Sequence, residues 1–203
     1  MQDELDILRE VGSIASAHGS IALSDILGRK INLSLPSVDT IPCNGVSTTI
    51  NIENIGISVI SKLLTGLKGK GIFLLDEKNA FKLIDLSYKI RGEDKKAGVL
   101  TEMGVSLIKE IGGIVIGAYV SALGIMFKRL ILPSPPTLIS GTMEEILSII
   151  ISTSGAEDYI LLIEAVFEES QEKIKGGFYL VLTPEAASDI KGACKRMLEE
   201  LEK

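Results

Sequence analysis

A glutamate with a polar residue one helical turn before it and a small residue one turn after it occurs twice in this chain. The first set is Asp6, Glu10 and Ser13, and the second set is Ser106, Glu110 and Gly113. Residues spaced by four and three lie on one face of a helix. Each set is therefore a candidate docking or catalytic surface. A lone exposed glutamate on a helix is usually only solvated, so the duplication is what singles these residues out.

The duplication extends well beyond the glutamates. When residues 6–36 are set over residues 106–136 without a gap, nine of the thirty-one positions are identical. Identity at a fixed offset indicates a repeated structural unit. We therefore predict one α+β domain over residues 1–203, with pseudo-twofold halves at 1–92 and 99–203. The polar, glycine-containing residues 91–98 are the predicted connection.

Each half reads in the same order. Apolar residues at three- and four-residue steps predict long helices near 3–28 and 99–128, each followed by an extended stretch that ends at Pro36 or Pro136. Apolar runs bounded by glycine and charges then predict strands at 57–65, 71–75, 159–167 and 177–182. Closing helices are predicted near 77–90 and 184–202, the latter capped by Thr183. The long helices are expected to pack on a mostly antiparallel sheet.

Composition excludes several classes of function. The net charge of −6 and the lack of a long Lys/Arg run argue against a nucleic-acid-binding protein. Two cysteines, without a Cys/His cluster, predict reduced thiols in the cytoplasm and no metal site. Acidic residues stand where the basic region of a signal peptide would be. The uncharged stretch 111–127 is just short of a membrane span and is interpreted as a buried helix, without membrane insertion.

The doubled pattern resembles the CheC/CheX/FliY phosphatases of bacterial and archaeal chemotaxis. Their signature is Asp/Ser-x3-Glu-x2-Asn-x22-Pro, and this chain matches its spacing at 6–36 and again at 106–136. The resemblance covers nearly the whole chain, and the length is that of a CheC-like protein. It implies docking to the phosphorylated response regulator CheY, with Asp6, Glu10, Ser106 and Glu110 as the partner-binding residues.

The resemblance also implies a mechanism, hydrolysis of the aspartyl phosphate of CheY. The glutamate would pair with a lysine near the CheY active site, and the asparagine amide would orient the attacking water. Phosphoryl transfer depends mainly on positioning and electrostatics. The magnesium ion would be carried by CheY, so no cofactor of the chain's own is expected.

The chain departs from the family at the asparagine, which is Ser13 in the first copy and Gly113 in the second. Gly113 has no side chain, and a Ser13 hydroxyl roughly 2 Å short of its target would miss hydrogen-bond range. With Glu10, Ser13, Glu110 and Gly113 as the candidate catalytic positions, we expect docking to survive and phosphatase activity to be weak. Losing a positioning contact of this kind costs about 10²-fold in rate.

Two alternatives remain open. The chain could be a binding module for CheY or CheD without turnover, as the FliM middle domain is in this superfamily, or a duplicated domain of unrelated function. The resemblance also implies CheD, a receptor-modifying deamidase, as a second partner. Its contact is expected on a helix over residues 135–147, where Gly141 replaces the family's aspartate. The same segment is equally explained as an amphipathic core helix.

Two further features have simple structural interpretations. His18, the chain's single histidine, lacks a partner at catalytic spacing and is interpreted as a surface or packing residue. The segment GLKGKG at 66–71 does not have phosphate-loop spacing and is interpreted as a hairpin turn.

Overall fold

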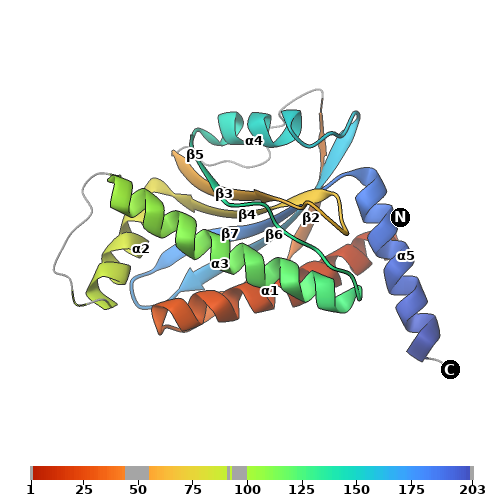
Figure 1. Cartoon of the computed structure of the whole chain (residues 1–203), viewed down its shortest axis with the longest axis horizontal. Helices are drawn as coiled ribbons and strands as arrows, with labels where there is room; N and C mark the ends of the chain where they lie inside the picture. Colours follow the sequence, from red (N-terminus) through yellow and green to blue (C-terminus); the bar gives the residue numbers. More distant parts are fainter. Residues whose placement is uncertain (1, 44–54, 91, 93–99, 202–203) are drawn as a thin grey trace.

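Two long antiparallel helices carry the repeated residues. The structure, a computed structural model, describes residues 2–43, 55–90, 92 and 100–201. In it α1 (Gln2–Leu27) and α3 (Glu102–Met126) lie side by side on one face of the sheet (Figure 1). Leu8, Val11 and Ala15 form the buried stripe that the periodicity of α1 predicted. Thr101 caps α3 by accepting a hydrogen bond from the Gly104 N–H at 3.1 Å. Both predicted helices are confirmed.

The sheet is antiparallel throughout. Its strands are β1 (Ile31–Leu33), β2 (Ser37–Pro42), β3 (Gly56–Lys62), β4 (Gly69–Asp76), β5 (Thr137–Gly141), β6 (Tyr159–Glu169) and β7 (Ile174–Leu182). They follow the order β1-β6-β7-β4-β3-β5, and β2 also pairs with β6. The predicted strands near 57–65, 71–75, 159–167 and 177–182 are therefore confirmed as β3, β4, β6 and β7.

The two sequence halves are interleaved in this sheet, with the β6–β7 pair of the second half between β1 and the β4–β3 pair of the first half. β2 precedes β3 in the chain but pairs with β6 of the second half, and β5 pairs with β3 of the first half. Along the path β2-β6-β7-β4-β3-β5, exchanging β2 with β5, β6 with β3 and β7 with β4 returns the same order read backwards. This arrangement is what an intertwined duplication would produce, and the duplication itself remains an inference from the sequence.

Within the described ranges, three further helices accompany α1 and α3. α2 (Glu77–Ile90) and α5 (Pro184–Leu201) follow β4 and β7, as the sequence predicted, and Thr183 Oγ1 accepts from the Ala186 N–H at 3.3 Å. α4 (Met143–Ser152) covers the sheet face opposite α1 and α3 (Figure 1). The larger apolar core lies between the long helices and the sheet, where Phe73 and Phe167 stack with ring centroids 5.5 Å apart. A second core lies beneath α4.

Two sequence predictions require correction. The extended stretches predicted to end at Pro36 and Pro136 continue past these prolines, because β2 and β5 begin directly after them. The predicted helix over 135–147 is wrong in its first half, since 137–141 is β5 and α4 starts only at Met143, where Thr142 is the N-cap and forms a capping box with Glu145. Short strands at a sheet edge have little periodicity, so tertiary pairing decides them. The predicted connection 91–98 lies outside the described residues except for Gly92.

The apolar stretch interpreted as a buried helix belongs to α3. By length and composition alone, α3 is the one helix among the described residues that would suffice to cross a membrane. In this structure it packs on α1, β3 and β4, and Ile108, Val115, Val120 and Leu123 are at most 1% exposed.

Candidate functional site

The motif side chains project from the outer side of the helix pair. Asp6, Glu10, Ser106 and Glu110 are all exposed. Asp6 accepts a hydrogen bond from Arg9 at 2.9 Å within α1, an exposed ion pair that contributes little to stability. The helical spacing predicted that each set shares one face, and on that face the third member of each set, Ser13 or Gly113, is half-buried.

The repeated glycines are the points where each long helix touches the sheet. A Cβ atom on Gly12 would come within 2.5 Å of Ile163 Cγ2, and one on Gly112 within 2.7 Å of Val59 Cβ. Ile163 lies on β6 between Val38 and Leu180, and Val59 lies on β3 at the corresponding place. Glycine is required because any side chain would push the helix off the strand. These contacts fix how closely each motif helix approaches the sheet.

The prolines explain the long spacing in the motif. After α1 the chain reverses and runs back along the helix, which brings Pro36 beside Gly12, with its Cβ 3.5 Å from a Cβ atom built on that glycine. After α3 it does the same, and Pro136 lies beside Gly113. Each proline then starts an edge strand, β2 or β5. The fold therefore brings together residues that are separated by more than twenty positions in the sequence.

Positions 13 and 113 differ in what they offer a partner. Ser13 is half-buried, and its carbonyl oxygen accepts from Ser16 Oγ at 3.1 Å. Among the described residues, the Ser13 hydroxyl has no hydrogen-bond partner. Gly113 offers no side chain, and a Cβ atom there would lie 3.1 Å from Pro136 Cγ. The first copy has a small hydroxyl at the motif position, and the second has only backbone.

The two motifs form separate surfaces. Gly19 faces Val115 and Tyr119, and Ile26 lies near Leu107, so α1 and α3 run antiparallel. At 1.5 Å per residue, Glu10 and Glu110 are then about 20 Å apart along the helix pair. This separation suits two docking events or two contacts on one large partner, and it excludes a joint catalytic pair of carboxylates.

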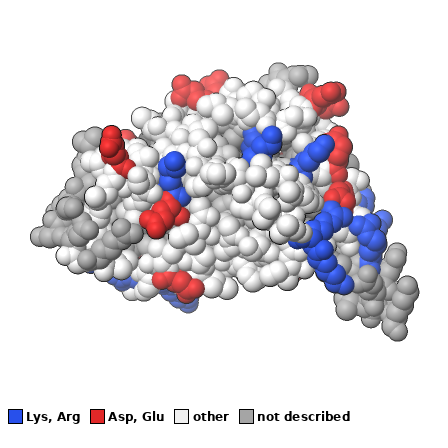
Figure 2. Space-filling view, viewed as in Figure 1, with Lys and Arg blue, Asp and Glu red and all other residues white. Residues whose placement is uncertain are grey.

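An exposed isoleucine lies one turn from each glutamate. Ile14 and Ile114, identical in the two copies, are 40% and 48% exposed, one turn beyond Glu10 and Glu110. Figure 2 shows that the surface over α3 and α1 is largely uncharged. Glu110 also borders a pocket of about 210 Å³ lined by Ile26, Ser87, Ile90, Leu107, Ile111 and Ile114. Sequence reasoning missed these isoleucines, although their identity in both copies was a usable signal.

The other features singled out in the sequence are His18, the 66–71 segment and Gly141. His18 is exposed on α1. The 66–71 segment lies in the connection and start of β4, with Gly66 at φ +73°, which confirms the hairpin interpretation. Among the described residues, no group of three or more His, Cys, Asp or Glu side chains is placed to hold a metal ion. Gly141 ends β5, and a Cβ atom there would lie 2.6 Å from Glu145 Oε2.

Sequence comparison finds relatives that are phosphatases. The chain is 24% identical over 191 residues to the CheY-P phosphatase CheC of Bacillus subtilis, covering 89% of this chain and 88% of that protein. It is 28% identical over 134 residues to the flagellar motor switch phosphatase FliY of the same organism. That match covers 66% of this chain and 34% of FliY. No protein-family model matches the sequence.

Structure comparison establishes the fold. Thermotoga maritima FliY matches 97% of this chain and 98% of its own with a TM-score of 0.77 at 21% identity. The FliM middle domain of Helicobacter pylori covers 95% and 99% of the two chains at 0.67 and 12% identity. A CheX–CheY–BeF₃–Mg²⁺ complex from Borrelia burgdorferi covers 85% and 96% at 0.56 and 21% identity. These likenesses confirm the predicted α+β class.

Proposed function

Because the chain belongs to the CheC/CheX/FliY family of CheY-P phosphatases, we propose that it docks a phosphorylated CheY-type response regulator. Docking uses two surfaces, one at Asp6 and Glu10 and one at Ser106 and Glu110. Hydrolysis of the aspartyl phosphate, if retained, is weak and proceeds at the Ser13 surface. The protein acts in the cytoplasm, and the magnesium ion comes with the phosphorylated partner.

One observation supports this proposal above the others. Both glutamates stand exposed on helices that are held to the sheet in the same way, by Gly12 on β6 and Gly112 on β3. The exposed Ile14 and Ile114 add an apolar contact beside each carboxylate. A carboxylate with an apolar neighbour suits a partner lysine, whose stem packs while its ammonium pairs.

The chemistry at the first surface depends on the reach of Ser13. A hydroxyl can donate and accept, as an amide can, but its oxygen is one bond from Cβ while the amide atoms are two bonds away. A water held at the distance set by the asparagine would therefore be out of its range. At the second surface, Gly113 has no group that could orient a water.

The alternative is a binding module without turnover. It has support from the substitution of both asparagines and from the likeness to the FliM middle domain, which is a likeness of fold. Such a protein would hold phosphorylated CheY and compete with its other partners. The two readings differ only in whether bound CheY loses its phosphoryl group faster than free CheY.

Phosphate release from phosphorylated CheY separates the two readings. We expect the wild type to accelerate release little or not at all, and Ser13→Asn to accelerate it by about 10²-fold relative to wild type. Binding is measured in parallel with beryllofluoride-activated CheY. The double variant Glu10→Ala/Glu110→Ala should lose binding, while Glu144→Ala, an exposed glutamate on the opposite face, should not.

The outcomes are distinct. Fast release by the wild type that Glu10→Ala abolishes would show that Ser13 suffices and that the expectation of weak activity is wrong. Binding that survives loss of both glutamates would refute the docking surfaces. No binding by any variant, with folding verified by circular dichroism, would leave the chain with a function outside response-regulator signalling.

CheD is proposed as a second partner, on α4 and the end of β5. The support is the family resemblance and the exposed Glu144, Glu145, Ser148 and Ile149, which border a shallow pocket of about 530 Å³. Gly141→Asp would restore the family residue, but its carboxylate would crowd Glu145 Oε2 in the capping box. Co-elution of CheD with wild type but not with Ile149→Asp would support this contact.

A further inference from the structure

Three surface positions change from polar to aliphatic between the two copies. Asp25, Lys30 and Asn32 of the first copy correspond to Ile125, Leu130 and Leu132 of the second. All six residues are exposed, and the three aliphatic ones are 77%, 70% and 45% exposed. Large aliphatic side chains gathered on a surface mark interaction sites more often than chance placement does.

The backbone at these positions is alike in the two copies. Gly28 and Lys128 both adopt positive φ, +57° and +51°. The next residue makes the same bond in each copy, since the Arg29 N–H donates to the Ser24 carbonyl at 3.2 Å and the Arg129 N–H to the Gly124 carbonyl at 2.9 Å. The first copy therefore demonstrates that this turn folds with polar side chains. Folding does not explain the aliphatic ones.

The aliphatic residues border a groove of about 630 Å³ between the last turns of α3 and the chain that returns from it. We call it the α3 groove, and its lining is Gly117, Ser121, Gly124, Ile125, Lys128, Arg129, Leu130, Ile131, Leu132 and Pro133. Gly117 leaves its floor open, because a Cβ atom there would meet nothing within 4 Å. Leu64, 59% exposed, adjoins the groove through its N–H, which donates to the Leu132 carbonyl at 2.8 Å.

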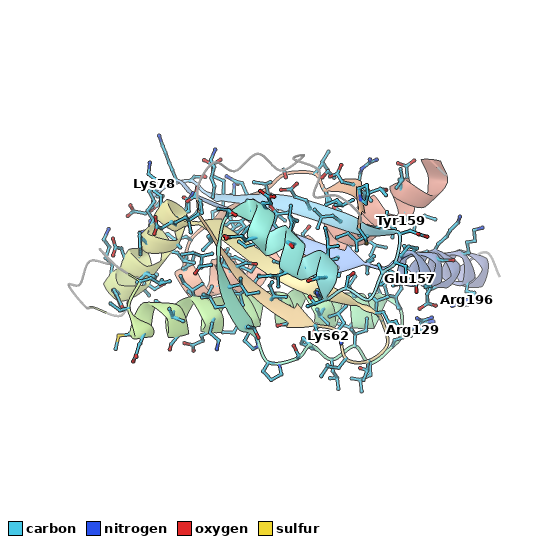
Figure 3. All side chains as sticks on the ribbon, turned by 90° about the horizontal axis from the view of Figure 1, so that it is seen from above. Lys62, Lys78, Arg129, Glu157, Tyr159 and Arg196 are labelled. Carbon is cyan, nitrogen blue, oxygen red and sulfur yellow. The ribbon has the colours of Figure 1, made fainter. Side chains whose placement is uncertain are left out.

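The charged residues that line the α3 groove are basic, although the protein is acidic overall. Its lining contains Lys128 and Arg129 and no acidic residue. Lys62 adjoins it through Ser134, whose N–H donates to the Lys62 carbonyl at 2.7 Å. Figure 2 shows Lys and Arg side chains at this end of the face, with acidic side chains next to some of them, and Figure 3 places Arg129 and Arg196 near each other beside α5. Asp189, which is bound to Arg129, neutralises part of this charge from the side of α5.

We propose that the α3 groove binds an acidic amphipathic helix of a partner protein. The aliphatic residues would receive its apolar side chains, and Lys62, Lys128 and Arg129 would face its carboxylates. Helices dock in such grooves through residues at i, i+3, i+4 and i+7, and the open floor at Gly117 and Ser121 permits close approach of a backbone. This contact lies outside the motif residues and does not depend on CheY.

Two other occupants fit the observations less well. A symmetric pair of this chain would bring two sets of Lys62, Lys128 and Arg129 against each other, and like charges would oppose that contact. An anionic bilayer would also attract these cations, but a bilayer is flat and favours a protruding apolar edge over a groove. Both occupants are outcomes of the test below.

The test uses a synthetic helical peptide of about 18 residues, long enough to hold a helix when stapled. It has leucine along one face and glutamate elsewhere, and a control peptide has lysine in place of glutamate. Fluorescence anisotropy measures binding to wild type and to the triple variant Ile125→Asp/Leu130→Lys/Leu132→Asn. Each substitution installs the side chain that the first copy already has at that place. The matched control Ile21→Ser removes an exposed isoleucine of α1 and installs the serine of the second copy.

We expect the acidic peptide to bind wild type and Ile21→Ser alike, and to bind the triple variant at least about tenfold more weakly. Added salt should weaken binding, and the lysine peptide should bind poorly. Equal binding to wild type and the triple variant, or no binding to either, would overturn the proposal. The proposal would also fail if the acidic peptide did not bind and the triple variant lost another interaction that the wild type makes. Lost adsorption to phosphatidylglycerol vesicles would assign the groove to a membrane surface, and lost self-association would assign it to a second copy.

Discussion

A Cβ atom on Gly113 would stand 3.1 Å from Cγ of Pro136, whereas position 13 already carries the side chain of a serine. The distance is a few tenths of an ångström tighter than an ordinary carbon–carbon contact. The two copies therefore differ in how readily they could regain the family asparagine. The second copy must move Pro136, the residue from which β5 begins.

This difference predicts unequal rescue of phosphatase activity. Ser13→Asn should raise phosphate release from phosphorylated CheY by about 10²-fold, since it restores a water-orienting amide without moving the backbone. Gly113→Asn should raise phosphate release less than Ser13→Asn does. It should also lower the melting temperature, by about 2–4 °C for each kcal/mol of strain in a protein of this size. Equal rescue at both positions, with unchanged melting, would mean that Pro136 yields freely.

The helix-to-sheet glycines Gly12 and Gly112 should be far more sensitive to substitution than Gly117, where a Cβ atom would meet nothing within 4 Å. Gly112→Ala places a methyl group 2.7 Å from Val59 Cβ, and Gly12→Ala places one 2.5 Å from Ile163 Cγ2. Each should destabilise the protein by about 1–3 kcal/mol through overpacking. Gly117→Ala, in the same helix as Gly112 but with open space around it, should stabilise the protein by about 0.5–1 kcal/mol. Urea unfolding measures all three, and a loss at Gly117 equal to that at Gly112 would contradict the packing argument.

Lys70 should make stability depend on pH. It is 6% exposed on β4, and its Nζ donates to the Ile150 carbonyl at 2.8 Å and to Thr153 Oγ1 at the end of α4. Burial, together with the charge of Lys62, lowers its pKa to about 8 from the usual 10.5. Between these two values the unfolded chain binds more protons, so the free energy of unfolding should rise with pH.

Comparison with Lys70→Met isolates this contribution. From pH 7.5 to 10, wild type should gain stability relative to the variant, at no more than about 1.4 kcal/mol per pH unit. The raised pKa values of Tyr119 and Tyr179, both caused mainly by burial, act on the two proteins equally and cancel. Parallel stability curves for the two proteins would show that the Lys70 ammonium is not desolvated in solution.

The interleaved strands predict that neither half folds alone. A fragment of residues 1–92 would contain β2 without its partner β6 and β3 without its partner β5. A fragment of residues 99–203 would contain β6 without β2 and β5 without β3. Each fragment should lack a cooperative thermal transition by circular dichroism, and an equimolar mixture should regain one. Cooperative unfolding of an isolated half would contradict the pairing of the two halves in one sheet.

Local patterns were sufficient for the long elements. The three- and four-residue steps of Leu8, Val11 and Ala15 predicted α1, and Thr183-Pro184 predicted the start of α5, because helix stripes and caps depend on neighbours within a few residues. The edge strand β5 was predicted wrongly as part of a helix, since TLISG acquires its conformation only from pairing with β3. The same limit explains the missed β2.

The sequence by itself determined the resemblance to the CheC/CheX/FliY phosphatases and the repeated positions, because the spacing of Glu10 and Glu110 and the identity of Gly12 and Gly112 are properties of one linear chain. Only the tertiary structure decided what those positions touch. Gly112 is required because Val59, more than fifty residues away in the sequence, packs against it. The side chain of Ile125 is exposed because the chain that returns from α3 does not cover it. Such contacts join residues distant in sequence, and a local pattern carries no information about which distant side chain will fill the neighbouring space.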